Sequence, residues 1–151
     1  MNNFMKIPDK IYQKVILSMP IPCVDLLVID KLGRVLMLKR KKPPAEGQWW
    51  FPGGRVFYHE LRIDAARRKL KEECGLEATS IRELGTYDVI FDCIPSNYAS
   101  HGITTVFHMV VDQNDVRLDN QSTNYAWKSV DSWLKEVQHE FLLSVLKQFI
   151  S

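Results

Sequence analysis

The chain has 151 residues, which fits one domain spanning 1–151 with a substantial core and excludes a second substrate-binding domain. Its formal net charge of +2 is spread along the chain without a basic run, so no nucleic-acid partner is expected. The cysteines are few, odd in number and widely separated, which predicts reduced thiols in a cytoplasmic protein and no zinc site.

The N-terminal part is predicted to form a helix and then a β-hairpin. Pro8 favours a helix start and Pro20 ends it, with apolar residues along one side. Polar residues before Pro8 argue against a signal peptide, and no window is long enough to span a bilayer, so no membrane partner is expected. Residues 21–29 and 34–40 are the predicted strands of the hairpin. Asp25 interrupts the first of them and either faces outward or lines a pocket.

The middle of the chain predicts a glycine turn at Gly53-Gly54, a short strand, a loop and a helix ended by Gly75. Glu72 and Glu73 emerge near the C-terminal end of this helix, close to the backbone carbonyls of the glycine turn. Taken singly, such glutamates are more often solvated surface charges. Together with the carbonyls they form an oxygen cage suited to a hard divalent cation that holds a substrate phosphate.

The rest of the chain alternates strands and loops before a helical end. Residues 93–102 are the longest polar loop and a candidate substrate lid. Mixed strands with one central helix and one or two closing helices predict an α+β fold or an α/β/α sandwich. The predicted strands are 80–92 with a turn signal at Gly85, 103–111, 116–118 and 125–127, and the closing helical region is 131–150.

The spacing from Gly54 to Leu76 resembles the Nudix box, Gly-x5-Glu-x7-Arg-Glu-U-x-Glu-Glu-x-Gly-U with U aliphatic. Glu60 and Arg68 stand at its fixed positions, and only Lys69 departs from it, where the pattern has a glutamate. The resemblance implies the Nudix fold, a mixed β-sheet between helices. It also implies a hydrolase that uses Mg²⁺, with Mn²⁺ possible, on a small nucleotide substrate.

Outside the box, residues 39–56 look like the GDP-mannose mannosyl hydrolases, which share a Lys-Arg, a Pro-Ala-x-Gly and a Pro-Gly-Gly-Arg-Val run. This resemblance implies a homodimer, for which the N-terminal helix and Trp49-Trp50 offer apolar surface; an intrachain core is the alternative for these residues. By the same resemblance and the oxygen-cage reasoning, the metal ligands are Gly53, Glu72, Glu73 and Gln121, the substrate contacts are Asp25, Arg40 and Arg55, and Arg68 contacts the diphosphate or the sugar.

Two departures concern catalysis. Ser122 stands where the mannosyl hydrolases have their histidine base, and Phe107 replaces a tyrosine. A serine accepts a proton poorly unless another group activates it, so the base has to come from elsewhere. The candidates are Glu72, His101, His108 and Asp119, among which His101 lies in the predicted lid.

Three functions follow for testing. The first is a Mg²⁺-dependent hydrolase of a nucleotide sugar such as GDP-mannose, with attack on either the anomeric carbon or phosphorus. The second is a general Nudix diphosphatase of ADP-ribose or modified nucleotides. The third is a nucleotide-binding module without turnover, which Lys69 makes conceivable because it replaces a carboxylate of the box.

Overall fold

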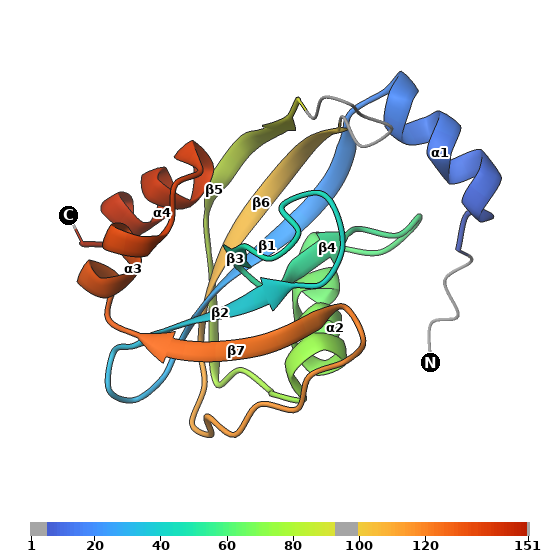
Figure 1. Ribbon diagram of the computed structural model, residues 1–151. Coiled ribbons are helices and arrows are strands. Elements are labelled where there is room, and N and C mark those ends of the chain that lie inside the picture. Colours follow the sequence, from blue (N-terminus) through green and yellow to red (C-terminus); the bar gives the residue numbers. More distant parts are fainter. Residues whose placement is uncertain (1–5, 93–99, 151) are drawn as a thin grey trace.

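The computed structural model describes residues 6–92 and 100–150, which build a mixed β-sheet between helices (Figure 1). The strands in this part of the chain are β1 (Ile21–Ile29), β2 (Val35–Arg40), β3 (Trp49–Trp50), β4 (Gly53–Arg55), β5 (Ser80–Phe91), β6 (Ser100–Val110) and β7 (Ser122–Lys128). The helices are α1 (Asp9–Ser18), α2 (Arg62–Cys74), α3 (Val130–Glu136) and α4 (Glu140–Ile150). The predicted α+β fold, with helices on both faces of a mixed sheet, is confirmed.

Strand alternation distributes two apolar cores over the two faces of the sheet. On β1, Leu26 and Val28 pack toward α2, whereas Leu27 packs toward α3 and α4. The buried Trp133 of α3 donates its indole N–H to the carbonyl oxygen of Val35 at 2.8 Å, which fixes this helix to β2. Helices therefore cover both faces of the sheet. No helix within the described ranges is long and apolar enough to cross a membrane.

The hairpin predicted for β1 and β2 forms only at its base. Ile29 pairs with Val35, and beyond that point each strand takes another partner. The segment 49–55 crosses the opening: β3 pairs with β2, and β4 then pairs with Cys23–Asp25 of β1. On its other edge β1 pairs in parallel with β6, while β2 pairs with β7. The sheet thus opens between β1 and β2 on the side where the polar residues gather.

The predicted glycine turn at Gly53-Gly54 is wrong, because both residues lie in strand β4. A glycine is needed at position 53 because β4 packs closely against β1, not because the chain turns there. A Cβ atom placed on Gly53 would lie 2.3 Å from the carbonyl oxygen of Val24, so only a bare Cα fits against β1. The glycine pair therefore brings β4 tightly against β1, immediately below α2.

Other boundaries also differ from prediction. Residues 116–118 form no strand, although Val116 is buried, because this short segment packs one side chain without joining the sheet. β6 begins at Ser100 instead of 103, and β5 runs through Gly85 with a shift of register instead of turning there. Helix α2, its end at the left-handed Gly75 and the two closing helices are confirmed. Most of the predicted lid, residues 93–99, lies outside the described residues.

The tryptophans proposed for a dimer contact belong to the intrachain core. Trp50 is buried against Phe91 and Phe141, and Trp49 packs against Trp133 with the two rings tilted. Helix α1 differs, since none of its residues is buried and it lies to one side of the sheet (Figure 1). The homodimer stays a prediction, and of the two surfaces named for it only α1 is left without buried residues.

Candidate active site

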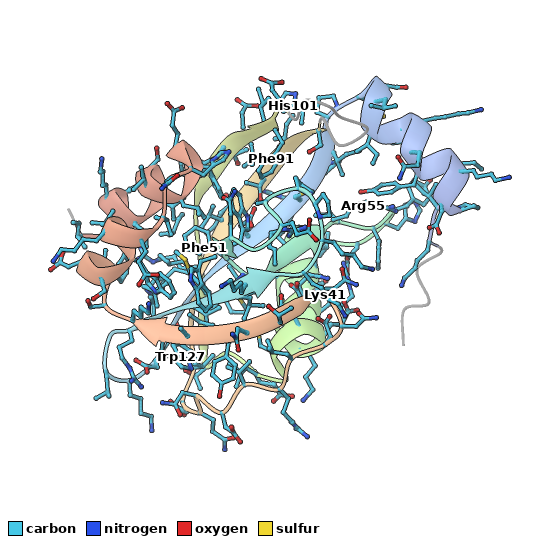
Figure 2. All side chains as sticks on the ribbon, viewed as in Figure 1. Lys41, Phe51, Arg55, Phe91, His101 and Trp127 are labelled. Atoms are coloured by element: carbon cyan, nitrogen blue, oxygen red, sulfur yellow. The ribbon has the colours of Figure 1, made fainter. Side chains whose placement is uncertain are left out.

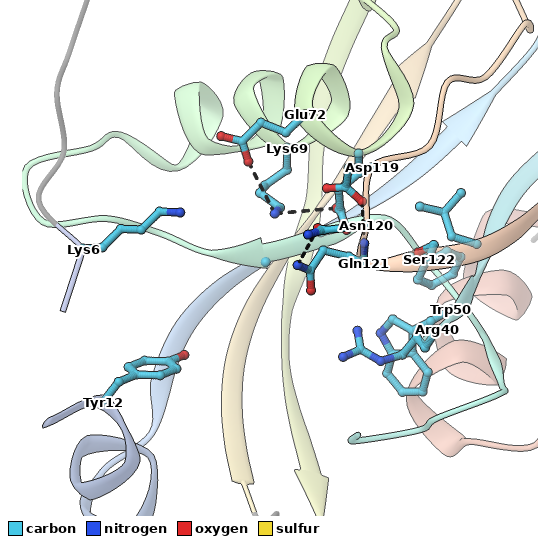
Figure 3. A pocket seen from close by; sticks show the side chains of 15 residues that line it. Lys6, Tyr12, Arg40, Trp50, Lys69, Glu72, Asp119, Asn120, Gln121 and Ser122 are labelled. Carbon is cyan, nitrogen blue, oxygen red and sulfur yellow. Dashed lines mark hydrogen bonds and ion pairs between the residues drawn. The ribbon is translucent and has the colours of Figure 1, made fainter. Parts of the chain in front are cut away.

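A cavity of about 690 Å³ lies at the opening between β1 and β2, below the C-terminal half of α2 (Figure 3). Its walls combine carboxylates, cations, amides and aromatic rings. The lining residues with functional side chains are Lys6, Tyr12, Arg40, Trp50, Lys69, Glu72, Glu73, Asp119, Asn120, Gln121 and Ser122, with Gly53 and Gly54 on the floor. Charges of both signs on one cavity suit an anionic ligand that is bound together with a cation.

Glu73 is the buried carboxylate of this cavity. Its Oε2 accepts a hydrogen bond from the backbone N–H of Gly53 at 2.8 Å, which orients the carboxylate across the gap between α2 and β4. Burial raises the pKa of Glu73 to about 7, and the nearby charge of Asp119 adds to the rise. The Lys69 ammonium, the Gly53 N–H and the Arg40 charge oppose it. Glu73 therefore sits where a cation would favour its charged form.

Glu72 and Lys69 flank Glu73 on the same helix. Glu72 is half exposed, and one of its oxygens lies 3.5 Å from the Lys69 ammonium. That ammonium is also 3.9 Å from an oxygen of Glu73. Positions three and four apart on a helix lie side by side, which explains why all three side chains meet. The residue that departs from the box pattern thus lies inside the site.

Arg68 is a structural anchor of the site. Its guanidinium binds the buried Glu60 through two hydrogen bonds, Nε to Oε2 at 2.7 Å and Nη2 to Oε1 at 3.0 Å. Nη2 also donates to the carbonyl oxygen of Arg55 at 2.9 Å, and the ring of Phe57 lies 3.9 Å below. Burial alone would raise the pKa of Glu60, but hydrogen bonds from Arg68 and Phe57 hold it below its ordinary range. Arg68 and Glu60 therefore tie α2 to β4, the two elements that carry the candidate ligands.

Asp25 lies buried beneath the cavity, at the point where β1 faces β4. Its Oδ2 accepts a hydrogen bond from the Thr104 hydroxyl at 2.6 Å. Burial raises the pKa of Asp25 to about 7, helped by the charge of Glu73 and opposed by hydrogen bonding from Thr104 and Trp50. Asp25 is buried, so the outward-facing alternative is wrong, and Asp25 is not itself among the residues that line the cavity. Arg40 lines the cavity nearby, and burial lowers its pKa.

The loop before β7 forms the wall opposite α2. Gln121 lines the cavity, its backbone N–H donating to Asp119 at 2.9 Å and its amide nitrogen to Asn120 at 3.1 Å (Figure 3). Ser122, which stands where the mannosyl hydrolases have their histidine base, also lines the cavity. Asp119 and Gln121 thus face Glu73 across one space, although nearly fifty residues separate them in the sequence.

Arg55 occupies a neighbouring pocket. Its guanidinium lies 5.1 Å from the centre of the Tyr12 ring and 5.2 Å from that of Phe57. This pocket has a volume of about 270 Å³ and shares Lys6, Tyr12, Lys69 and Glu72 with the larger cavity. Sequence reasoning missed Lys6 and Tyr12, because no motif marks them and only the packing of the N-terminal segment brings them here.

The structure does not bring His101 to the site. It lies in strand β6, and its Nε2 is 2.9 Å from an oxygen of Asp88 (Figure 2). His101 lies near the start of β6, opposite Ile90 of β5 and five residues before Val106, which pairs with Asp25, so its position along the strand leaves it outside the cavity. His108 stacks on Phe149 of α4 and does not line the cavity either. Among the base candidates, Glu72 and Asp119 remain.

The donor set fits magnesium. No group of three or more His, Cys, Asp or Glu side chains in residues 6–92 and 100–150 is arranged to hold a metal ion alone. Magnesium, however, prefers one or two carboxylates, retained waters and substrate phosphates to an all-protein cage. Glu72 and Glu73, with the oxygens of Gly53 and Gln121 on the same cavity, match that preference.

Comparisons with known proteins agree with this arrangement. A family model described as "NUDIX domain" matches residues 19–149. The "Low-salt glycan biosynthesis protein Agl8" of Haloferax volcanii is 34% identical over 118 residues, covering 77% of this chain and 75% of that protein. An "RNA pyrophosphohydrolase" of Hydrogenovibrio crunogenus is 31% identical over 145 residues, covering 86% of each.

Solved structures show the same fold. The crystal structure of a MutT protein from Methanosarcina mazei has a TM-score of 0.71 and 23% identity, covering 89% of this chain and 98% of that one. The family model spans the sheet, α2 and the closing helices, and the first relative matches most of the chain. This protein therefore belongs to the Nudix hydrolase family.

Proposed function

We propose that this Nudix hydrolase is a magnesium-dependent enzyme that cleaves a nucleoside diphosphate linked to a sugar, GDP-mannose being the substrate class to test first. The observation that carries the proposal is the meeting of two kinds of charge on one cavity. Glu72 and Glu73 lie on one wall, and Arg40 and Lys6 line the same space. Carboxylates hold a divalent cation and cations hold phosphate oxygens, so the cavity suits a metal-bound diphosphate.

Magnesium, when bound, would neutralise phosphate charge and favour departure of the leaving group. Glu72, Glu73, Gln121 and the carbonyl of Gly53 are the proposed ligands. The hydrogen bond from the Gly53 N–H to Glu73 already holds that carboxylate toward the cavity. Such preorganisation reduces the rearrangement needed when the ion binds.

The chain's own residues supply the remaining steps. We assign Arg40 to a phosphate oxygen, because a guanidinium fork matches phosphate geometry. Arg55, beside Tyr12, is assigned to the outer part of the substrate through the shared wall of the two pockets. Asp25 is assigned to the nucleotide end, next to Trp50, and Arg68 acts as a positioning residue through its bonds to Glu60.

For proton transfer we propose Glu72, with Asp119 as the competing candidate. Glu72 is half exposed and lines the cavity, so a water molecule can reach it. Asp119 faces Glu73 from the opposite wall. A pH profile of kcat for Glu72→Gln beside Asp119→Asn separates them, because loss of the base removes the acidic limb of the profile.

The nucleotide-sugar assignment is supported by the run of residues 39–56 and by the relative whose name refers to glycan biosynthesis. A second candidate, attack on phosphorus within the same linkage, is favoured by the retention of Glu72 in the helix. The test is product analysis after incubation with Mg²⁺ and GDP-mannose, beside Glu73→Gln. GDP with free mannose supports attack at carbon, and GMP with mannose 1-phosphate supports attack at phosphorus.

Oxygen-18 water gives an independent answer, because the label enters the sugar in the first case and phosphate in the second. Parallel assays with ADP-ribose and nucleoside triphosphates test the general diphosphatase function. A clear preference for triphosphates would refute the nucleotide-sugar assignment. Tight binding across the panel without product would instead establish a binding module. Cytoplasmic location and homodimer formation stay proposals, to be tested by fractionation and by light scattering.

A further inference from the structure

The side chain that departs from the family pattern is seated in the wall of the cavity. Lys69 is only 15% exposed, and its ammonium lies between the carboxylates of Glu72 and Glu73. The end of its aliphatic stem passes over Gly54, where a Cβ atom would lie 2.8 Å from Cε. Gly54 therefore leaves the space that the lysine uses, and Figure 3 shows the ammonium directed into the cavity. This is a built position rather than a solvated helix face.

Lys69 changes the charge that the helix offers to a metal. The formal charges of Lys69, Glu72 and Glu73 are +1, −1 and −1, a sum of −1, whereas a glutamate at the first position would give a formal sum of −3. Affinity for hard divalent cations follows the number of charged ligands, so this helix is a weaker cation site than the family pattern would make.

The Lys69 ammonium interacts with Glu72 and Glu73 through charge attraction, and it is free to bind another anion in the cavity. Its distances of 3.5 Å and 3.9 Å to the two carboxylates are longer than the roughly 2.7–2.9 Å of a charge-assisted hydrogen bond. A compact ammonium on a flexible stem can therefore turn to a stronger acceptor without breaking a well-formed bond. A phosphate group entering the cavity would supply that acceptor.

We propose that Lys69 is a tethered cation that takes the place of one divalent ion in the diphosphate site. Without ligand it neutralises Glu72 and Glu73, and with ligand its ammonium binds a phosphate oxygen. The identity of that anion rests on the proposed function, whereas the effect of Lys69 on metal binding does not. The site then needs one magnesium ion less than an all-carboxylate helix would.

The first test measures metal binding directly. The full chain is titrated with Mn²⁺ and the free ion is followed by electron paramagnetic resonance. Lys69→Glu should bind Mn²⁺ at least about tenfold more tightly than the wild type, with Lys69→Gln in between. Lys71→Gln is the matched control, because this lysine lies on the same helix but pairs with Glu77. Equal Mn²⁺ affinity in the wild type, Lys69→Gln and Lys69→Glu would overturn the proposal.

The second test measures phosphate binding without metal. Pyrophosphate and GDP are titrated in the presence of EDTA, with binding followed by calorimetry. Lys69→Gln should weaken binding about tenfold, and Lys71→Gln should leave it unchanged. Equal affinity in the wild type and Lys69→Gln would refute the phosphate contact. Near-ultraviolet circular dichroism checks that Lys69→Glu folds, and Lys69→Gln carries both tests if it does not.

The two proposals fail separately. If the wild type hydrolyses no substrate of the panel, the proposed function falls and the Mn²⁺ titration still decides the role of Lys69. If the wild type is active and Lys69→Gln alters neither Mn²⁺ nor phosphate binding, only the role of Lys69 falls.

Discussion

Replacing the buried Asp25 by asparagine should make the protein more stable at alkaline pH. Asp25 is enclosed by β1, β4 and β6, and its pKa is raised from 3.8 to about 7, mainly by burial. Above that pH the native state must hold a buried carboxylate, whereas the unfolded chain exposes it to water. Asparagine has nearly the same shape and keeps an oxygen that can accept the Thr104 hydroxyl.

The sign and the size follow from proton linkage. A pKa raised in the native state means that the native state binds the proton more tightly than the unfolded chain. The resulting stabilisation is complete below the unfolded pKa and disappears as the pH rises through about 7. A difference of about three pKa units at about 1.4 kcal/mol each gives about 4 kcal/mol as the upper limit of the effect. Wild type and Asp25→Asn should therefore diverge with increasing pH.

Urea unfolding followed by tryptophan fluorescence, in EDTA and from about pH 5 to about pH 9, measures this divergence. Asp30→Asn is the contrasting control. Asp30 is also buried, but hydrogen bonds from Arg34 and Leu32 overcome the effect of burial and lower its pKa. Its stabilisation is lost only in acid, so Asp30→Asn should shift stability by a constant amount over this range. Parallel curves for wild type and Asp25→Asn would show that the native carboxylate titrates normally and would refute the argument.

Three further changes test other parts of the site. Gly53→Ala should lower the free energy of unfolding by about 3 kcal/mol or more in chemical denaturation, because the backbone of β1 must move. Gly54→Ala should lower it less, since only the flexible end of Lys69 is displaced. Equal losses in the two variants would contradict the packing argument. Arg68→Met should cost about 3 kcal/mol by leaving Glu60 buried and unpaired, and adding Glu60→Gln should recover part of it in thermal melts. EDTA should abolish hydrolysis with recovery by Mg²⁺, and Glu73→Gln should lower kcat at least about a hundredfold; full activity in EDTA would exclude the metal.

The sequence predicted best what depends on neighbours along the chain. The apolar stripe of α2 and its glycine end specify that helix locally, and a short, nearly continuous apolar run specifies β1. The glycine pair was misjudged because the close approach of Val24 to Gly53 is a contact between distant segments. Val116 looked like part of a strand because it is apolar, yet burial of a single side chain needs no strand.

For the candidate site too, local sequence identified some residues, whereas contacts between distant segments were not predicted. Glu72 and Glu73 were identified by the box, and both line the cavity. His101 was chosen for its chemistry in a predicted loop, but strand pairing, which a single sequence does not reveal, directs it away. Arg68 was expected to contact the diphosphate or the sugar, whereas its shortest side-chain hydrogen bonds go to Glu60, eight residues away. Local spacing thus gives the candidate ligands, and only the fold gives their partners.

The partly formed hairpin determines what sets the width of the candidate site. β1 and β2 pair directly only where Ile29 meets Val35, and beyond that point the two strands separate. β1 carries Asp25 and pairs with β4, whereas β2 carries Arg40 and pairs with β7. Residues 49–55 link the two strands beyond that pair, so the separation of Asp25 and Arg40 depends on this segment and on the packing around Ile29, not on hydrogen bonds between β1 and β2.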